Sequence, residues 1–591
     1  MSLYQAPLKD MQLLLQHALE RSGVRDLPEF AEFDDELIAA VLDEAGKFAG
    51  GELAPLNSVG DTQGCRFEDG KVITPDGWKE AFQQFSESGW MGLALPADFG
   101  GQSLPKFIAQ PVNEMWLSAN LAFVMFQALA QGGSEILLHF GSDEQKARYL
   151  EPIITGQWTI AMALTEPNAG SDLGALTTKA IPQDDGQYLI KGQKIYITYG
   201  EHDLAENIVH LVLARTPDAP AGSRGISLFA VPKHRINSDG TLGEANDVVC
   251  TGIEHKTGLH GSPTCSMSYG ENDACYGELI GEENRGLMAM FILMNEARLS
   301  CGMQGVALGE MGFQRALEYA HERTQGADYQ SGERVAIAKH PDVARMLLSI
   351  RAEVMGLRSL GYLLAALIDK SEQCDADESQ ALKARIALLT PVFKGCATER
   401  ANLMAGTTIQ IFGGMGFVEE TGVAQLMRDA RVTTIYEGTT GIQARDLVFR
   451  KVQADKGAAL TALLDEIEAV ATRLSENEAI ASLAAQLNNA CTQMRSALDQ
   501  ITDRENADQL QLNAGGVAFM DALGTLCCAW QLADIALAAE AKAAAGEDPD
   551  YHTNLVALAE FYFSYSVPNI EAGLKTFNQA HQGVGRYRFD L

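Results

Sequence analysis

The stretch WTIAMALTE, residues 158–166, marks the point where the pattern of the chain changes from helical to β. Three more short runs rich in β-branched and aromatic residues follow it: YLIKGQKIYIT (188–198), NIVHLVLART (207–216) and GISLFAVPK (225–233). Gly, Pro, Asp and Asn separate the runs, as they do between the strands of an antiparallel sheet. We therefore expect an antiparallel sheet or barrel over residues 159–281.

The sequence on both sides of this region has helical periodicity. DDELIAAVLDEAGKFAGGEL (34–53) repeats apolar residues at three- and four-residue steps, and SDEQKARYLEPIITG (142–156) opens with Ser142 and Asp143 as plausible caps. The clearest helical pattern covers residues 286–325. After residue 450, three or four more long helices are predicted, the last one kinked or broken at Pro568.

These patterns predict an α+β multidomain protein. We expect an N-terminal α-helical domain, a middle antiparallel β domain, a C-terminal α-helical bundle and an additional C-terminal helical domain. The predicted boundaries are 1–35 for an N-terminal extension, then 36–158, 159–281, 282–449 and 450–591. A length of 591 residues agrees with three or four separate cores.

Composition restricts the classes of function. The formal net charge of −33 makes nucleic acid or an anionic membrane surface an improbable partner. The ten cysteines form no CxxC pair, so we predict reduced thiols and no metal site. The N-terminus lacks the order of a signal peptide, and no apolar run approaches eighteen residues. We expect a cytoplasmic protein.

Two polar stretches of the predicted β domain are candidate ligand sites. ALTEPNAGSD (163–172) closes a strand with backbone and hydroxyl donors that could hold a pyrophosphate or the polar edge of a flat ring. An ordinary β-turn is the alternative interpretation. In GQKIYITYG (192–200), Tyr196 and Thr198 stand two residues apart and should share one face of a strand.

Two further stretches lie in the later helical region. QIFGGMGF (410–417) has a glycine pair that permits close backbone approach, but it follows a helix and is no dinucleotide fingerprint. RDARVTTIYEGTTGIQARD (428–446) places Glu437 just before a Gly-Thr-Thr-Gly turn. A carboxylate at such a junction is either a catalytic base or a solvated loop acid, and the residues themselves leave both open.

The order of these motifs resembles the acyl-CoA dehydrogenase family. ALTEPNAGSD, GQKIYIT, RGLMAM…NEARL, HERTQG, QIFGGMGF and RDARVTTIYEGTTGIQ occur in the family order over residues 36–450. The extra C-terminal helices are similar to those of a larger bacterial subgroup. That subgroup includes long-chain fatty acyl-CoA dehydrogenases and 3-methylmercaptopropionyl-CoA dehydrogenase.

The resemblance implies that Glu437 is the catalytic base. In this family the glutamate of the YEGT motif removes a proton α to the thioester carbonyl, while a hydride leaves the β-carbon for flavin N5. Some members carry the base immediately before the arginine of the long helix after the sheet. That position is Ala297 here, which cannot accept a proton, and Glu296 is turned about 100° away on a helix.

The resemblance also implies the residues that bind FAD and the substrate. The expected flavin-binding residues are Leu164 through its backbone, Thr165, Gly170, Ser171, Tyr196, Thr198, Arg323, Gln325, Gln410, Gly413, Gly414 and Thr439. The expected substrate-binding residues are Ser171, Asn295, Arg298, Tyr436 and Gly438.

Three positions depart from the family pattern. Tyr196 stands where many members have tryptophan, and Asn295 where others have aspartate. The phenylalanine-glycine that usually follows Gln325 is missing, which puts the contact of this region with a neighbouring subunit's FAD in doubt.

We therefore expect an FAD-dependent acyl-CoA dehydrogenase that makes a trans-2-enoyl-CoA, as in fatty acid β-oxidation, and passes electrons to electron-transfer flavoprotein. The alternatives are a dehydrogenase specific for the methylthio substrate, an acyl-CoA oxidase, and a non-catalytic relative. We also expect a homodimer without stable membrane insertion, because the added helices are acidic where a membrane-binding segment would be basic.

Overall fold

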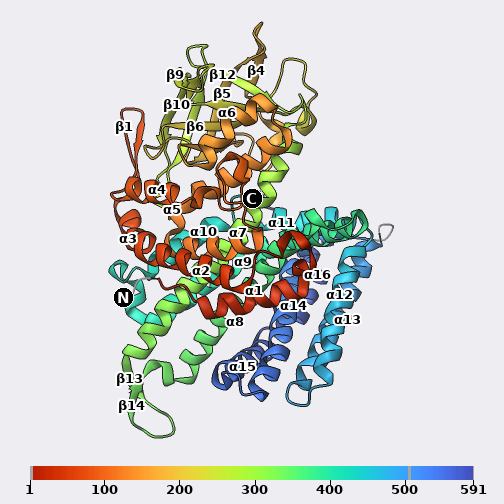
Figure 1. Ribbon diagram of the computed structural model, residues 1–591. Helices are drawn as coiled ribbons and strands as arrows, with labels where there is room; N and C mark the ends of the chain where they lie inside the picture. Colours follow the sequence, from red (N-terminus) through yellow and green to blue (C-terminus); the bar gives the residue numbers. More distant parts are fainter. Residues whose placement is uncertain (1–3, 504–506, 590–591) are drawn as a thin grey trace. The chain divides into compact units, whose positions relative to one another are not determined.

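The computed structural model describes residues 4–503 and 507–589 (Figure 1). The chain forms two compact units, each built from segments far apart in the sequence. Unit 1 comprises Met1–Gly46, Lys106–Ser118 and Cys301–Leu591, and unit 2 comprises Lys47–Pro105 and Ala119–Ser300. The long helices α5 (Lys106–Phe140) and α7 (Gly286–Glu322) each contribute residues to both units.

The largest sheet of unit 2 has eight strands, most of them antiparallel, as the sequence predicted. They are β3 (Trp158–Ala163), β4 (Lys179–Pro182), β5 (Tyr188–Thr198), β6 (Asn207–Ala214), β7 (Ser227–Pro232), β10 (Val248–Ile253), β11 (Thr264–Tyr269) and β12 (Tyr276–Ile280). The strand order is β10-β11-β5-β12-β7-β6-β3, and β4 pairs with β5. One pair departs from the antiparallel pattern, because β3 and β6 run parallel with Trp158 opposite Asn207.

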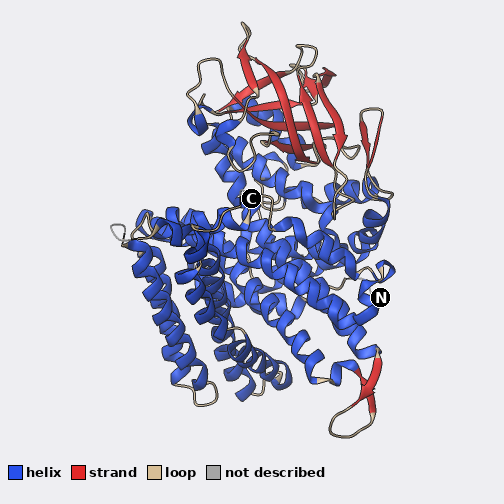
Figure 2. Ribbon diagram, turned by 180° about the vertical axis from the view of Figure 1, so that it is seen from behind, coloured by secondary structure: helices blue, strands red, loops and turns tan. Residues whose placement is uncertain are grey.

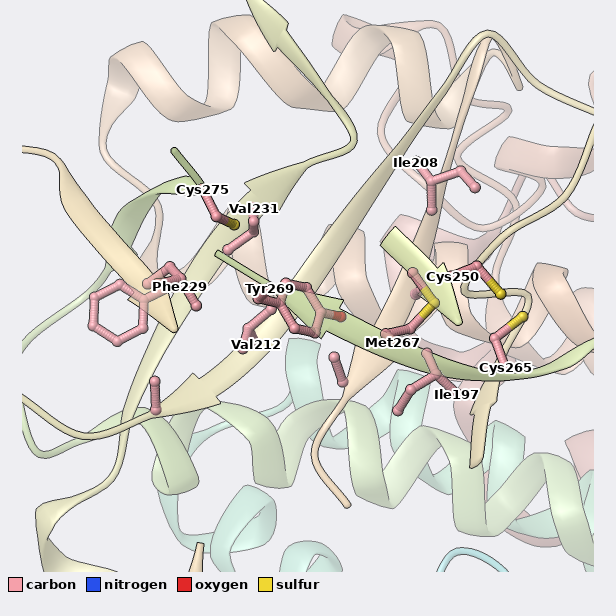
Figure 3. Close-up of a cluster of buried hydrophobic side chains, with 14 of the residues drawn as sticks. Ile197, Ile208, Val212, Phe229, Val231, Cys250, Cys265, Met267, Tyr269 and Cys275 are labelled. Atoms are coloured by element: carbon pink, nitrogen blue, oxygen red, sulfur yellow. The ribbon is translucent and has the colours of Figure 1, made fainter. Parts of the chain in front are cut away.

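The core of this sheet is apolar and tightly filled (Figure 3). Side chains from β5, β6, β7, β10 and β11 meet there, and Figure 3 shows the sulfur atoms of Cys250 and Cys265 on neighbouring strands pointing toward one another. All ten cysteines are free thiols, and eight of them are buried.

Smaller elements complete unit 2. Its helices include α3 (Ala54–Gln63), α4 (Trp78–Glu87) and α6 (Asp143–Ile154), and its short strands form the hairpins β1 (Arg66–Glu68) with β2 (Lys71–Ile73) and β8 (His234–Ile236) with β9 (Leu242–Ala245). The cap predicted at Ser142 is confirmed, since its side chain accepts the Gln145 N–H and the Gln145 side chain returns to the Ser142 backbone. The sequence analysis did not predict the β1–β2 hairpin within the N-terminal helical region.

The α5 helix bends at Asn120, whose backbone is not helical. The Asn120 side chain accepts the Phe123 N–H at 3.1 Å, so it caps the second half of the helix. Beyond it, Phe123 and Phe126 are fully buried against Phe85. These two phenylalanines therefore pack in the core of unit 2.

A helical bundle forms the centre of unit 1. It contains α8 (Pro341–Gln373), α9 (Ala376–Phe412), α10 (Val423–Thr433) and α11 (Thr440–Arg445). Arg358 of α8 lies fully buried and donates to Glu114 of α5 at 2.7 Å and to Glu310 of α7 at 2.8 Å. Buried charges of this kind are tolerated only when they are paired, so these three helices must meet in one geometry.

The first residues of the chain are part of this unit. The sequence analysis treated 1–35 as an extension, but the structure has α1 (Leu8–Ser22) packed against α8. A second short helix, α2 (Asp35–Phe48), follows it. Asp10 is buried, pairs with Arg351 and accepts the Tyr551 hydroxyl at 2.8 Å. The extension therefore contacts both the bundle and the C-terminal helices.

The C-terminal helices are α12 (Ala458–Ser475), α13 (Ala481–Thr502), α14 (Gln509–Ala544), α15 (Pro549–Tyr565), α16 (Pro568–Gln579) and α17 (His581–Val584). The break predicted at Pro568 is confirmed, because α15 ends at Tyr565 and α16 starts at the proline. Arg400 of α9 ties α14 to the bundle, since it donates to Asp521 at 2.8 Å and to Glu353 at 2.7 Å.

Unit 1 is otherwise helical in the residues that the structure describes, apart from the hairpin of β13 (Thr324–Ala327) and β14 (Arg334–Ala336) (Figure 2). Within residues 4–503 and 507–589, two helices, α5 and α14, are long and apolar enough to cross a membrane. The most apolar windows of these helices are 78% and 89% buried, as in core helices of soluble proteins.

Candidate active site

The loop that follows β3 is held from inside unit 2 by a buried ion pair. Lys194 is fully buried on β5 and donates to the carbonyl of Leu164 at 3.0 Å and to the Glu166 carboxylate at 2.9 Å. Glu166 also accepts the N–H groups of Thr177 and Thr178 at 2.6 and 3.0 Å. The first residues of the predicted flavin loop therefore have a defined conformation before any ligand binds.

The charges of this pair are set by burial and by each other. Burial acts to raise the pKa of Glu166, but the Lys194 ammonium and the hydrogen bonds from Thr177 and Thr178 outweigh it and lower the pKa to about 2. Burial lowers the pKa of Lys194 to about 8, against the opposing effect of the Glu166 charge. Both groups are charged at neutral pH.

The outer part of the loop is open. No atom outside the neighbouring residues lies within 4 Å of a Cβ built on Gly170, and Gly170 and Ser171 are both exposed. The Asp172 side chain accepts the Gly174 N–H and begins a short helical turn, η6 (Leu173–Ala175). A ligand can therefore approach the backbone at Gly170 without displacing protein atoms.

A β-bulge in β5 turns Tyr196 outward. Cys265 of β11 pairs with Ile197 and Met267 pairs with Lys194, so two residues of β5 oppose the one residue between those partners. Tyr196 has a left-handed backbone with φ of 60° and a ring that is 61% exposed. Thr198 is half-buried, while Ile197 between them is buried.

This arrangement fits the flavin that the sequence predicts. An exposed aromatic ring, the hydroxyls of Thr165 and Thr198, and an open glycine backbone all lie on β5 or on the loop after β3. The Ile195 N–H donates to the Thr165 carbonyl at 2.9 Å, which joins the loop to the strand. A flat ring with a polar edge matches this set of groups.

The two predicted CoA-binding residues lie on α7, also in unit 2. Asn295 is exposed, and Arg298 is 7% exposed and three residues further along. Residues at this spacing are neighbours on a helix surface. Ala297, where some family members carry the base, is buried, and Glu296 is half-buried.

Glu437 lies in unit 1 on the turn between α10 and α11, and the turn is strained. Its φ is 54°, a left-handed conformation that side chains other than glycine rarely adopt, and Gly438 follows with φ of 93°. Such a conformation costs about 1–3 kcal/mol and persists only where the surroundings impose it. The Glu437 side chain is half-buried.

Five side chains stabilise this turn. Lys394 of α9, which is fully buried, donates to the Gly438 carbonyl at 2.7 Å. Gln443 of α11, also fully buried, donates to the carbonyls of Glu437 and Gly438 at 3.1 and 3.2 Å. The Thr440 hydroxyl donates to Glu399 at 2.5 Å, and Thr439 caps α11 by accepting the Ile442 N–H.

Tyr436 precedes the turn and points into the bundle. Its hydroxyl donates to Gln304 of α7, and burial raises its pKa well above the usual value. The phenol is therefore protonated at all physiological pH values and serves as a hydrogen-bond donor.

The remaining predicted flavin residues gather where α7 and α9 end. The rings of Tyr319 and Phe412 stack there with centroids 4.2 Å apart. Close to them in the chain stand the exposed residues Arg323, Gln325, Gln410, Gly413 and Gly414. The Gln325 carbonyl hydrogen-bonds to the His340 ring at 2.7 Å, which holds β13. Gly413 and Gly414 face open space.

Four side chains that shape these regions were not predicted from the sequence. Glu166 and Lys194 were inside the quoted motifs but were given no role, and Gln443 follows the Gly-Thr-Thr-Gly turn. Lys394 is a lone charge in the apolar helix segment LLTPVFKGCA (388–397). A single cation in a run that must be buried is a signal that could have identified it.

The fold and these regions define the class of protein. Four family models match the chain in order: the acyl-CoA dehydrogenase N-terminal domain (36–157), middle domain (161–271) and C-terminal domain (284–452), and the acetyl-CoA dehydrogenase C-terminal-like domain (463–584). The chain belongs to the acyl-CoA dehydrogenase family and is an enzyme of that family. FAD is the cofactor of this family, and the residues described above fit it.

Individual relatives extend this assignment. The chain is 44% identical to 3-methylmercaptopropionyl-CoA dehydrogenase of Ruegeria pomeroyi over 562 residues, which are 95% of each protein. It is 35% identical to a butyryl-CoA dehydrogenase of Syntrophomonas wolfei, over 98% of this chain and 97% of that protein. A crystal structure of Caenorhabditis elegans ACDH-11 in complex with C11-CoA shares the fold, with a TM-score of 0.75 and 21% identity over 98% of this chain and 92% of that chain.

Proposed function

We propose that this enzyme converts an acyl-CoA thioester to the trans-2-enoyl-CoA, with Glu437 as the base that removes the α-proton. The observation that supports this role most strongly is the strained turn at Glu437, which side-chain hydrogen bonds from Lys394 and Gln443, and between Thr440 and Glu399, hold in place. A strained residue held in this way is typical of a catalytic position.

The turn serves two needs of the reaction. An α-C–H is a very weak acid, so the negative charge that develops on the thioester oxygen must be stabilised by a preorganised donor. A carboxylate and a backbone N–H on the same residue can remove the proton and bind that oxygen together. FAD, when bound, supplies the acceptor for the hydride that leaves the β-carbon.

We assign the other residues of this proposal by their chemistry. Tyr196 and Thr198 would contact the face and the edge of the flavin, with Thr165, Gly170 and Ser171 on the loop beside them. Arg298 would bind the phosphates at the nucleotide end of CoA, because a guanidinium pairs with phosphate by two hydrogen bonds.

Two acyl groups are the leading candidates for the substrate. The 44% identity to a 3-methylmercaptopropionyl-CoA dehydrogenase favours a methylthio-propionyl thioester. The butyryl-CoA dehydrogenase relative favours a short straight chain. Both candidates are short acyl groups, shorter than the chains used by the long-chain members that the sequence analysis considered.

A substrate ladder tests the reaction and its specificity together. The holoenzyme is mixed without oxygen with straight-chain acyl-CoAs of increasing length and with the methylthio substrate. We expect rapid bleaching of the flavin absorbance by a short thioester. A colourless purified protein, or a flavin that no acyl-CoA bleaches, would contradict the proposed function and favour a non-catalytic relative.

Electron-transfer flavoprotein is the proposed electron acceptor, as in other dehydrogenases of this family. An acyl-CoA oxidase would instead give its electrons to oxygen. The two are separated by turnover with and without electron-transfer flavoprotein in air. Fast hydrogen peroxide formation without that acceptor would show an oxidase.

A homodimer is the proposed assembly, in the cytoplasm and without membrane insertion. Large apolar side chains stand exposed on neighbouring elements of unit 1, at the end of α9, in the turn after it and on α10. They are Leu403, Met415, Phe417, Val418 and Met427. Exposed apolar surface of this kind marks a protein interface, and a second copy of this chain would cover it. Light scattering should give the mass of two chains, and cosedimentation with anionic liposomes would contradict this proposal.

A further inference from the structure

The carbonyl groups of Glu437 and Gly438 both face buried donors. Gln443 reaches both carbonyls through one amide nitrogen, and the Lys394 ammonium reaches the second. Each carbonyl belongs to a rigid peptide plane, and the two planes meet at the Cα of Gly438. Holding the two oxygens therefore fixes φ and ψ of Gly438. The Glu437 side chain is attached at the edge of this fixed unit.

The donors come from elements that cannot easily move. Lys394 and Gln443 are both 0% exposed, so neither side chain can swing into solvent and leave the turn. Lys394 and Glu399 project from the same helix, α9, and Glu399 accepts the Thr440 hydroxyl two residues beyond Gly438. The long α9 helix therefore holds the turn at two points, and Gln443 of α11 holds it at a third.

Burying a lysine beside the proposed catalytic turn costs desolvation free energy, so its presence there calls for an explanation. Transferring an ammonium group out of water is costly, and an apolar residue of the same size would pack in this helix without that cost. The hydrogen bond from a charged donor is shorter and stronger than one from a neutral donor, which suits a turn that must be held against backbone strain. The Lys394 ammonium contacts the backbone carbonyl of Gly438, the residue that follows the proposed base in the chain.

We propose that Lys394 and Gln443 are positioning residues that hold the Glu437–Gly438 turn in its left-handed conformation and so set the geometry of proton removal. This inference rests on the proposed role of Glu437 as the base. Neither residue touches the substrate or takes up the proton. Both act through the backbone of the turn.

The test uses the full-length holoenzyme with Lys394→Met and Gln443→Met, which keep side-chain length and remove the donor. We expect both variants to retain FAD, and kcat to fall by roughly 10- to 100-fold, because small displacements of a catalytic group have effects of this size. The KM for the acyl-CoA should change little, since no substrate contact is lost.

A matched control is Thr398→Val. Thr398 is buried on α9 one turn after Lys394, and its hydroxyl donates at 2.8 Å to the Lys394 carbonyl of its own helix. This nearly isosteric change removes a buried polar group from the same helix without touching the turn, so kcat should stay at the wild-type value. An equal loss of kcat in the control would overturn the proposal, because it would show general damage to α9.

The outcomes distinguish the positioning role of Lys394 and Gln443 from the proposed role of Glu437 as the base. Wild-type kcat and KM in Gln443→Met would overturn the positioning role even if Lys394→Met failed to fold. Turnover retained by Glu437→Gln would overturn the proposed function itself. Turnover lost in Glu437→Gln but normal in both methionine variants would overturn only the positioning role.

Discussion

Two loops of this enzyme are each held by a fully buried lysine that donates to a backbone carbonyl. In unit 2, Lys194 donates to Leu164 at the start of the predicted flavin loop, and in unit 1, Lys394 donates to Gly438 beside the proposed base. The first lysine is also paired with Glu166, a carboxylate that is itself 4% exposed. A hydrogen bond from a buried lysine to a backbone carbonyl therefore holds a loop in each unit.

The difference lies in the groups that each lysine contacts. Glu166 accepts hydrogen bonds from Lys194, Thr177 and Thr178, so its lone pairs are used in holding the loop. The Glu437 side chain is half-buried on a strained turn that is held through its backbone carbonyls. Lys194 therefore contacts a carboxylate directly, whereas Lys394 contacts the backbone of the residue that follows the proposed base.

The same substitution, glutamate to glutamine, should have different effects at Glu437 and at Glu166, and the larger effect is expected at the proposed base. Glu437→Gln should keep the yellow colour and the melting temperature while turnover falls by roughly 10²–10⁴-fold, the usual effect of removing a general base. The amide has nearly the same shape but cannot take up a proton. Steady-state turnover with the best substrate of the ladder measures the loss, and more than half the wild-type activity would rule out Glu437 as the base.

Glu166→Gln should show the opposite pattern. Removing one partner of a buried ion pair costs about 3–5 kcal/mol, because the other charge is left without compensation. We expect a lower unfolding midpoint in urea and faster loss of FAD on dilution, since the loop that Lys194 and Glu166 hold would loosen. A Glu166→Gln variant that kept its flavin and its stability but lost turnover would show that Glu166 acts in the reaction and does not stabilise the loop.

The stability that Glu166 contributes should depend on pH. The folded-state pKa of Glu166 is lowered to about 2, so its contribution to stability is fully present above its ordinary value near 4.5 and is lost as the pH falls toward 2. The stability difference between the wild type and Glu166→Gln should therefore shrink as the pH is lowered through this range. Urea unfolding at several pH values measures it, and a difference independent of pH would show that the charge of Glu166 is not what holds the loop.

The smallest effect is expected at a third buried cation, Arg298 of α7. Arg298→Ala should weaken the binding of full CoA thioesters by about 1.5–3 kcal/mol, the value of a charge-assisted contact. A substrate truncated to the pantetheine portion should bind as it does to the wild type. Equal losses with both substrates would show that Arg298 supports the helix, and would place it with Lys194 rather than with the binding residues.

Much of the architecture could be predicted because its signals are local. Helical and strand periodicity, the cap at Ser142 and the break at Pro568 each depend on a few consecutive residues and on backbone sterics. The order of the motifs was sufficient to identify the family, which the four family models confirm. Glu437 was identified as a candidate because turn-forming residues follow it directly.

Other features depended on contacts between residues distant in the sequence, and only the tertiary structure decided them. The sequence from residue 1 to 35 does not indicate that α1 packs against α8, because the Asp10 partners stand at positions 351 and 551. The bulge that turns Tyr196 outward depends on the register between β5 and β11. Likewise, the residues next to Lys394 in the sequence do not indicate its hydrogen-bond acceptor, which is 44 residues away. A buried charge must find a partner, but chain folding alone determines which one it meets.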